Sequence, residues 1–131
     1  SPASGMWVLE QGGKVVGSVG VKANNNAKNK TPETLSLELT RMYVDVSIRG
    51  LGYGQRLIER AFAHAKAHGI SEIFLTTPSV NVPAIGFYQH MGFLAERRFE
   101  VEGPDGAPLE LTKLKEDLFT LQICNNVWAK D

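Results

Sequence analysis

The sequence predicts a single α/β domain over residues 1–131, and three observations support that class. Leucines and polar residues alternate from residue 35, which is typical of a β-strand, here expected to run to residue 46. A glycine-rich segment at residues 50–54 then opens an amphipathic helix. Residues 72–76 form an apolar strand after that helix, so we expect a parallel, right-handed crossover. With 43% hydrophobic residues, 131 residues suffice for one core.

A β-hairpin is expected at the start of the chain. Residues 6–10 and 14–21 are rich in β-forming residues, and the intervening Gln-Gly-Gly supplies the positive φ angles of a tight turn. Gly17 and Gly20 weaken the second strand and indicate a bulge or a close approach by another chain or a ligand. Residues 23–33 lack apolar periodicity and are rich in turn formers, which predicts an exposed loop.

The longer strand and the helix after the glycines have defined faces. Glu38 lies between two leucines, so its side chain should point to the opposite face from theirs. The helix is expected to end at Gly69, and its apolar face holds Leu57, Ile58, Ala61, Phe62 and Ala65. The later elements are expected to be a helix at 82–91 stopped by Gly92, a strand at 93–102, a turn at 103–106, a loop or short helix at 109–117, and a last strand at 118–124.

Composition excludes several classes of function. Fourteen basic residues balance fourteen acidic ones, so no net field favours nucleic acid. No run of about 18 apolar residues is present and the start lacks a signal peptide, so we expect an intracellular or cytoplasmic protein without membrane contact from this chain. Cys124 is the only cysteine, which excludes an internal disulfide, and no metal site is expected because the three histidines lack metal-ligand spacing.

The segment Arg49-Gly50-Leu51-Gly52-Tyr53-Gly54 predicts an anion site. Glycines let the backbone approach a ligand closely, and free N–H groups at a helix N-terminus favour negative charge. A dinucleotide-binding loop fits poorly, because the third glycine spacing and a suitable acidic residue are missing. A Walker loop would need Gly-Lys-Ser/Thr, and a loop selected only for turning is the remaining alternative.

Two motifs together carry a family resemblance. The segment 49–54 resembles the Gln/Arg-x-x-Gly-x-Gly/Ala pyrophosphate loop of the GCN5-related N-acetyltransferases, the GNAT family. Residues 81–93, Asn-x-x-Ala-x-x-x-Tyr-x-x-x-Gly-Phe, are similar to the second signature of that family. Residues 7–8, 13–17 and 38–42 look like its camello-type branch. The resemblance implies a GNAT fold, a mixed central sheet flanked by helices, and here the usual N-terminal strand and helix pair are absent, as in an N-terminally truncated domain.

The resemblance also implies roles for particular residues. Acetyl-CoA would be the co-substrate, with its pyrophosphate on residues 49–54. The Met42 backbone N–H would meet the acetyl oxygen if the strand bulges there, and Val44 would bond the pantetheine arm like an added strand. Glu38 is the candidate base, acting directly or through water, with a solvated glutamate as the alternative. Tyr88 is the candidate acid, or else a structural tyrosine, and Asn81 would lie near the pantetheine.

The sequence thus predicts an N-acetyltransferase that moves acetyl from acetyl-CoA to a primary amine by direct transfer in a ternary complex. The alternative is an acetyl-CoA-binding module without turnover, acting as a regulatory or interaction domain. The acceptor, a small-molecule amine or a protein amino group, stays open. An incomplete domain with open edges also suggests a homodimer, and membrane association would require a segment missing from the N-terminus.

Overall fold

The computed structural model describes residues 3–24 and 36–118. In chain order its elements are β1 (Gly5–Gln11), β2 (Lys14–Ala23), β3 (Ser36–Val44), the 3-10 helix η2 (Val46–Ile48), α1 (Tyr53–Ala67), β4 (Glu72–Pro78), α2 (Val82–His90), β5 (Leu94–Glu102) and β6 (Pro108–Asp117). The six strands form one sheet in the order β1-β2-β3-β4-β6-β5. The α/β class predicted from the sequence is therefore confirmed.

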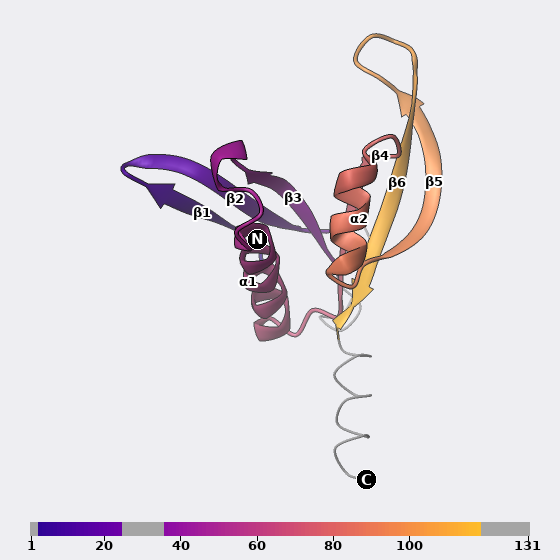
Figure 1. Ribbon diagram of the computed structural model, residues 1–131. Coiled ribbons are helices and arrows are strands. Elements are labelled where there is room, and N and C mark those ends of the chain that lie inside the picture. The colour runs from indigo at the N-terminus through magenta and orange to yellow at the C-terminus, as the bar shows by residue number, and fades with distance from the viewer. Residues whose placement is uncertain (1–2, 25–35, 119–131) are drawn as a thin grey trace. The chain divides into compact units, whose positions relative to one another are not determined.

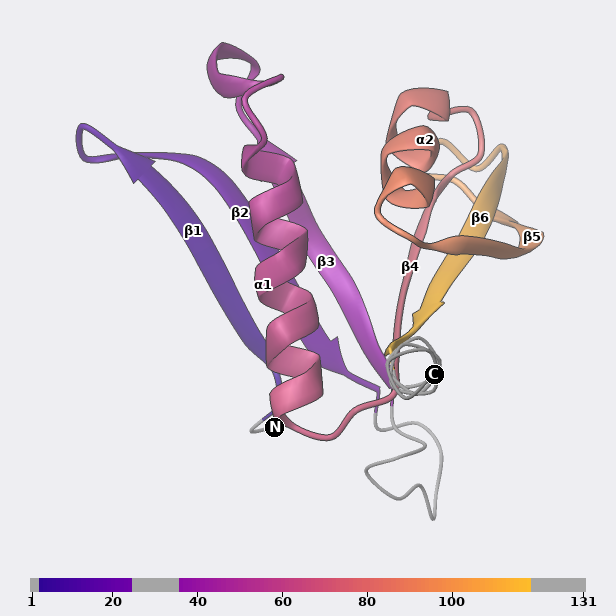
Figure 2. The same ribbon diagram turned by 60° about the horizontal axis from the view of Figure 1, so that its bottom comes forward.

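The chain divides into two compact units. The first holds the described residues up to Ile73 together with Asp117 and Leu118, and the second holds residues 74–116. In the first unit, β1, β2 and β3 lie side by side and α1 runs along one face of them (Figure 2). Both strand pairs, β1 with β2 and β2 with β3, are antiparallel, so the predicted hairpin is confirmed.

The core of the first unit lies between α1 and these strands. Four of the five residues predicted for the apolar face of the helix are buried: Leu57, Ile58, Ala61 and Ala65. They are completed from the strands by buried apolar side chains such as Val19 and Leu37, both fully inaccessible to solvent. The helix ends as predicted, because Gly69 follows the His68 C-cap with φ +69° and reverses the chain.

The second unit contains α2 beside the antiparallel β5–β6 hairpin (Figure 1). Phe93 is 1% exposed and is the largest fully buried side chain among the described residues, with the Tyr88 ring in an edge-on contact at 5.7 Å. The chain reaches β5 through Gly92, whose φ of +107° ends α2 as expected. The helix therefore stops where the sequence predicted it.

The prediction of a loop or short helix at residues 109–117 is wrong, because this segment is the strand β6. Its buried residues, Thr112, Leu114 and Glu116, recur with a period of two, and β5 pairs with residues 108–115, with Val101 opposite Leu109 and Ala95 opposite Leu114. The turn at residues 103–107 closes this hairpin through a Gly103 N–H to Ala107 O hydrogen bond of 2.8 Å.

Other predictions lie outside the described residues. These are the exposed loop from residue 25 onward and the last strand from residue 119 onward, including Cys124. Within residues 3–24 and 36–118, no helix is long and apolar enough to cross a membrane.

Candidate active site

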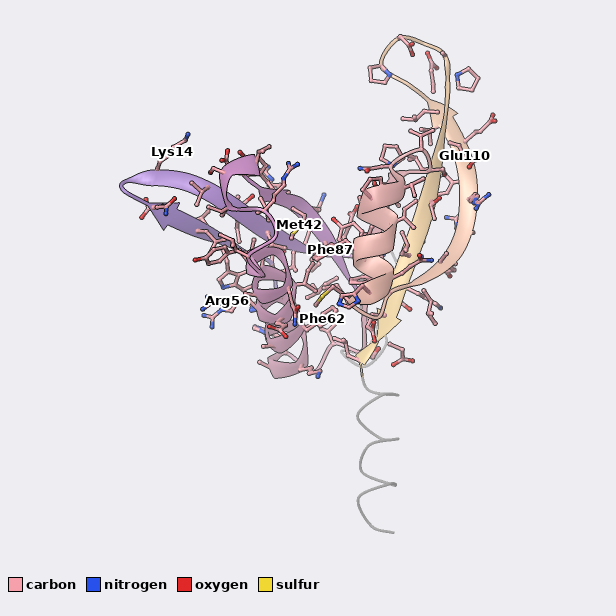
Figure 3. The ribbon with its side chains drawn as sticks, viewed as in Figure 1. Lys14, Met42, Arg56, Phe62, Phe87 and Glu110 are labelled. Atoms are coloured by element: carbon pink, nitrogen blue, oxygen red, sulfur yellow. The ribbon has the colours of Figure 1, made fainter. Side chains whose placement is uncertain are left out.

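A β-bulge interrupts β3 at Arg41 and Met42. Tyr43 is paired with Ser18 and Thr40 with Gly20, so Arg41 and Met42 together lie opposite the single intervening residue of β2. Arg41 has φ +51°, a left-handed conformation that is uncommon for a residue with a side chain. The extra residue of a bulge leaves the regular ladder of hydrogen bonds. The sequence predicted a role for the Met42 backbone N–H only if β3 bulges there. The structure has that bulge (Met42 is labelled in Figure 3).

The bulge also changes which side chains of β3 share a face. Directly opposed residues of an antiparallel pair lie on the same face, and Glu38 is opposite Lys22 while Tyr43 is opposite Ser18. Glu38 and Tyr43 therefore share a face, although a regular strand would place residues five apart on opposite faces. The leucines at 37 and 39 are buried on the other face, and Glu38 is half-buried. The predicted orientation of Glu38 away from the leucines is consistent with this pattern.

A hydrogen-bonded turn replaces the last two residues of the predicted third strand. Asp45 caps η2, and its carboxylate accepts from the Tyr43 hydroxyl at 2.7 Å, from the Ser47 backbone N–H at 3.0 Å and from the Ser47 hydroxyl. These donors, the Ser47 hydroxyl first, lower the pKa of Asp45 to about 2. The Asp45 N–H donates to Val16 O at 2.8 Å, which fixes the turn to β2.

Arg49 lies directly after this turn. Its Nε donates to the Val44 carbonyl at 2.9 Å, and its side chain is exposed. That bond uses one of the five N–H donors of the guanidinium and one of the two lone pairs of the Val44 carbonyl. The Val44 N–H remains a candidate to bond the pantetheine arm.

The glycine loop has the backbone geometry of an anion site. Gly50 has φ +80° and Gly52 has φ +87°, and no described heavy atom lies within 4 Å of a Cβ built at either residue. Leu51 between them is 67% exposed. The loop therefore presents open backbone, and without a side chain at Gly50 or Gly52 a ligand could approach it closely.

The start of α1 continues this surface. Gly52 is the N-cap, and the first turn has no side-chain cap hydrogen bond among the described residues. The Arg56 N–H donates to Gly52 O at 3.2 Å, so the N–H groups of Tyr53, Gly54 and Gln55 precede the first intrahelical bond. Three backbone donors at the positive end of a helix dipole suit a phosphate group. The residues present therefore fit the pyrophosphate of CoA.

Asn81 and Tyr88 lie in the second unit, on α2. Asn81 is the exposed N-cap of the helix, and its Oδ1 accepts from the Ala84 N–H at 3.4 Å. Tyr88 is 9% exposed, with the rings of Phe87 and Phe93 at 5.5 Å and 5.7 Å. Burial raises the pKa of the Tyr88 phenol, so it stays protonated at neutral pH. A protonated phenol is the form that a general acid requires.

The predicted residues thus divide between the units. The first unit brings Glu38, Met42, Val44 and residues 49–54 together on one continuous strand, turn and helix. The second unit carries Asn81 and Tyr88. Among the described residues, no group of three or more His, Cys, Asp or Glu side chains is arranged to hold a metal ion.

Sequence reasoning missed the turn residues Tyr43, Asp45 and Ser47. The local signal was present, because aspartate followed two residues later by serine is a common start of a helical turn. The expectation that the strand continued to residue 46 concealed it.

Known proteins match the part of the chain that contains these residues. The sequence model described as "Acetyltransferase (GNAT) family" matches residues 1–93. Human N-acetyltransferase 8B is 34% identical over 87 residues, which cover 66% of this chain and 37% of that protein. Rat N-acetylaspartate synthetase is 36% identical over 92 residues, covering 70% and 28%. The uncharacterized N-acetyltransferase YjgM of Escherichia coli is 32% identical over 92 residues, covering 70% and 52%. The chain thus spans between about a quarter and a half of these relatives.

Solved structures share the fold. A putative acetyltransferase from Salmonella typhimurium, solved with acetyl-CoA, aligns with a TM-score of 0.74 at 22% identity, over 88% of this chain and 65% of that chain. An N-acetyltransferase from Staphylococcus aureus aligns with a TM-score of 0.75 at 24% identity, over 89% and 69%.

The fold is that of solved acetyltransferases. The chain belongs to the GNAT family of acetyltransferases. The resemblance found in the two sequence motifs is confirmed, and the N-acetyltransferase 8 relatives agree with the camello-type branch.

Proposed function

We propose that this chain transfers the acetyl group of acetyl-CoA to a primary amine by direct attack in a ternary complex. The observation that carries the proposal is the sequence of features along β3 and α1. A half-buried carboxylate at Glu38, a bulge at Arg41–Met42, an ordered turn at Asp45 and an open glycine loop follow one another within residues 38–54. The family supplies acetyl-CoA as the co-substrate of this arrangement.

The loop formed by residues 49–54 holds the pyrophosphate of CoA in this proposal. Its support is the open backbone at Gly50 and Gly52 and the first-turn N–H groups of α1. Charge-assisted bonds from backbone N–H groups to phosphate are among the stronger hydrogen bonds of proteins. Arg49 adds a positive charge at the entrance to the loop.

The bulge serves the reacting carbonyl. As the amine attacks, the acetyl oxygen gains negative charge, and a fixed backbone donor stabilises that charge more than it stabilises the ground state. The Met42 N–H is the donor that we propose for this oxygen, and the Val44 N–H binds the pantetheine arm. Both roles need only backbone atoms, so the side chains at these positions remain free to pack.

Proton transfer requires a base and an acid. Glu38, directly or through water, takes the proton that the amine must lose, and a new C–N bond forms as the C–S bond breaks. The departing thiolate of CoA takes a proton from the Tyr88 phenol, which burial keeps protonated. The exposed Asn81 contributes to holding the pantetheine arm.

The acceptor is a primary amine, on a small molecule or on a protein. One relative is named N-acetylaspartate synthetase, and one structural neighbour is a NatC complex bound to a Gag peptide. These names come from both acceptor classes, so the test must include amino acids and peptides. We propose an intracellular location for the chain, in line with its single cysteine.

Thiol release from acetyl-CoA over a panel of amines tests the proposal, with both substrates varied. We expect amine-dependent release and intersecting double-reciprocal lines, since both substrates must be bound together. Glu38→Gln should lower kcat by about 10²- to 10⁴-fold, the usual contribution of a general base, without changing the Kd for CoA. Glu110→Gln, an exposed carboxylate on β6, is the matched control with unchanged rates.

Two results would contradict the proposal in different ways. Tight acetyl-CoA binding without thiol release for every amine would favour a binding module. Parallel lines would instead indicate an acetyl-enzyme intermediate.

A further inference from the structure

The peptide group between Arg41 and Met42 is held from its carbonyl side. The Ser18 hydroxyl on β2 donates to the Arg41 carbonyl at 2.6 Å, at the short end of the range for O–H···O bonds. Ser18 is 8% exposed, so little water competes for this bond. The bond therefore ties the irregular residue of the bulge to the neighbouring strand.

The geometry of the peptide relates that bond to the Met42 N–H. This peptide is trans, so its carbonyl and its N–H point in opposite directions within one plane. Because Ser18 draws the Arg41 carbonyl toward β2, the Met42 N–H is turned away from β2. A side-chain hydroxyl on one strand thus sets the direction of a backbone donor on the next.

The conformation of Arg41 needs such support. A φ of +51° is unfavourable for a residue with a Cβ and persists when the surroundings hold it in place. β2 and β3 approach each other closely on both sides of the bulge, since a Cβ at Gly20 would lie 2.8 Å from Thr40 Oγ1 and one at Gly17 would lie 3.1 Å from Tyr43 O. Gly17 and Gly20, predicted to mark a bulge or a close approach by another chain or a ligand, each lie beside a register shift.

We propose that Ser18 is a positioning residue that orients the Met42 N–H toward the acetyl oxygen. The inference rests on the proposed acetyltransferase function and goes beyond it by naming a residue on β2, outside both sequence motifs. Ser18 acts through the peptide group and does not touch the substrate. Loss of its hydroxyl should therefore weaken the stabilisation of the acetyl oxygen and leave the affinity for CoA unchanged.

Kinetics and binding separate these effects. Ser18→Ala should lower kcat by about ten- to a hundredfold, approaching the loss seen when an oxyanion donor is removed. The Kd for CoA, which lacks the acetyl group, should stay within about twofold of wild type. Ser18→Thr keeps the hydroxyl and should restore kcat. Ser36→Ala is the matched control, because it removes another buried serine hydroxyl of the first unit, one that accepts from Asn24 Nδ2 at 3.4 Å.

The sequence allows the peptide group itself to be observed. The chain has three methionines, and only Met42 follows an arginine. Labelling with carbonyl-¹³C arginine and ¹⁵N methionine therefore gives one carbonyl-to-amide NMR correlation, from the Arg41–Met42 peptide. In wild type, acetyl-CoA should shift this amide signal more than CoA does. In Ser18→Ala the Arg41 carbonyl signal should move, and the extra amide shift caused by the acetyl group should disappear.

Several results would overturn the role of Ser18. These are an unchanged kcat in Ser18→Ala, an equal loss of affinity for acetyl-CoA and CoA in Ser18→Ala, or failure of Ser18→Thr to restore kcat. If Ser18→Ala does not fold, equal Met42 shifts with both ligands in wild type would still refute the proposal. A wild-type chain that binds neither ligand would contradict the acetyltransferase function instead.

Discussion

Gly50 and Gly13 offer a matched test of the glycine loop. Both have φ +80°, and neither has a described heavy atom within 4 Å of an added Cβ. Alanine at either position must therefore adopt the same unfavourable backbone conformation without any new clash. Gly13 lies in the β1–β2 turn and Gly50 in the proposed pyrophosphate loop, so only the ligand distinguishes the two substitutions.

The cost to stability follows from the backbone. A left-handed conformation costs an alanine about 1–2 kcal/mol, and the stiffer unfolded chain offsets about 0.4–1 kcal/mol of this. The net loss is about 1 kcal/mol for Gly50→Ala and for Gly13→Ala. With an unfolding entropy of about 2.1 cal/mol/K per residue over the 131 residues, each variant should melt about 4 °C below wild type.

The effect on CoA binding should differ. A Cβ at Gly50 would obstruct a backbone bond to phosphate, and hydrogen bonds to charged groups contribute about 1.5–3 kcal/mol. The Kd for CoA should therefore rise by about ten- to a hundredfold in Gly50→Ala. Isothermal calorimetry at 25 °C, where both variants are folded, should give the wild-type Kd for Gly13→Ala. Equal loss of affinity in both variants, or in neither, would refute the placement of pyrophosphate on this loop.

Three further predictions concern single side chains. Tyr88→Phe should lower kcat with little change in CoA affinity. Because burial raises the pKa of Tyr88, wild type should also lose stability as pH rises beyond about 10, where the unfolded tyrosine ionises first, whereas urea unfolding of Tyr88→Phe should show a flatter pH profile. The Asp45 carboxyl, with a pKa of about 2, should titrate near that value by NMR. Its stabilisation is present above an unfolded pKa of about 3.9 and is lost as pH falls toward the folded value, so Asp45→Asn should remove that dependence, and a midpoint near 4 would contradict the turn. Gly92→Ala should cost about 3 kcal/mol, well above Gly13→Ala in the same melting assay, because its φ is +107° and its Cβ would contact the buried Glu116 carboxylate; an equal loss would show that the contact relaxes.

Local features of the fold were predictable because they depend on neighbouring residues alone. The buried face of α1 follows from helical spacing, and the reversals at Gly69 and Gly92 follow from the freedom of glycine at positive φ. The same chemistry indicated the anion loop at residues 50–54. Pairing between distant segments is a different kind of information.

The residues that escaped prediction depend on such pairing. Residues 109–117 contain leucine, lysine and glutamate, which are good helix formers, and pairing with the neighbouring strands β4 and β5 makes them a strand. The bulge at Arg41 is visible only in the register with β2, so neither the shared face of Glu38 and Tyr43 nor the bond from Ser18 could be derived from the sequence. The family resemblance indicated that a bulge at Met42 would be needed to present its N–H, and the pairing of β3 with β2 determines the conformation of that bulge.

The most direct test of the proposed CoA site is an NMR titration of ¹⁵N-glycine-labelled chain with CoA. The proposal that the loop before α1 holds the pyrophosphate predicts saturable shifts of the Gly50, Gly52 and Gly54 amides. The amides of Gly12 and Gly13, in the hairpin turn, should not move. Saturable CoA binding that leaves the amide signals of the three loop glycines unchanged would contradict the proposed pyrophosphate site.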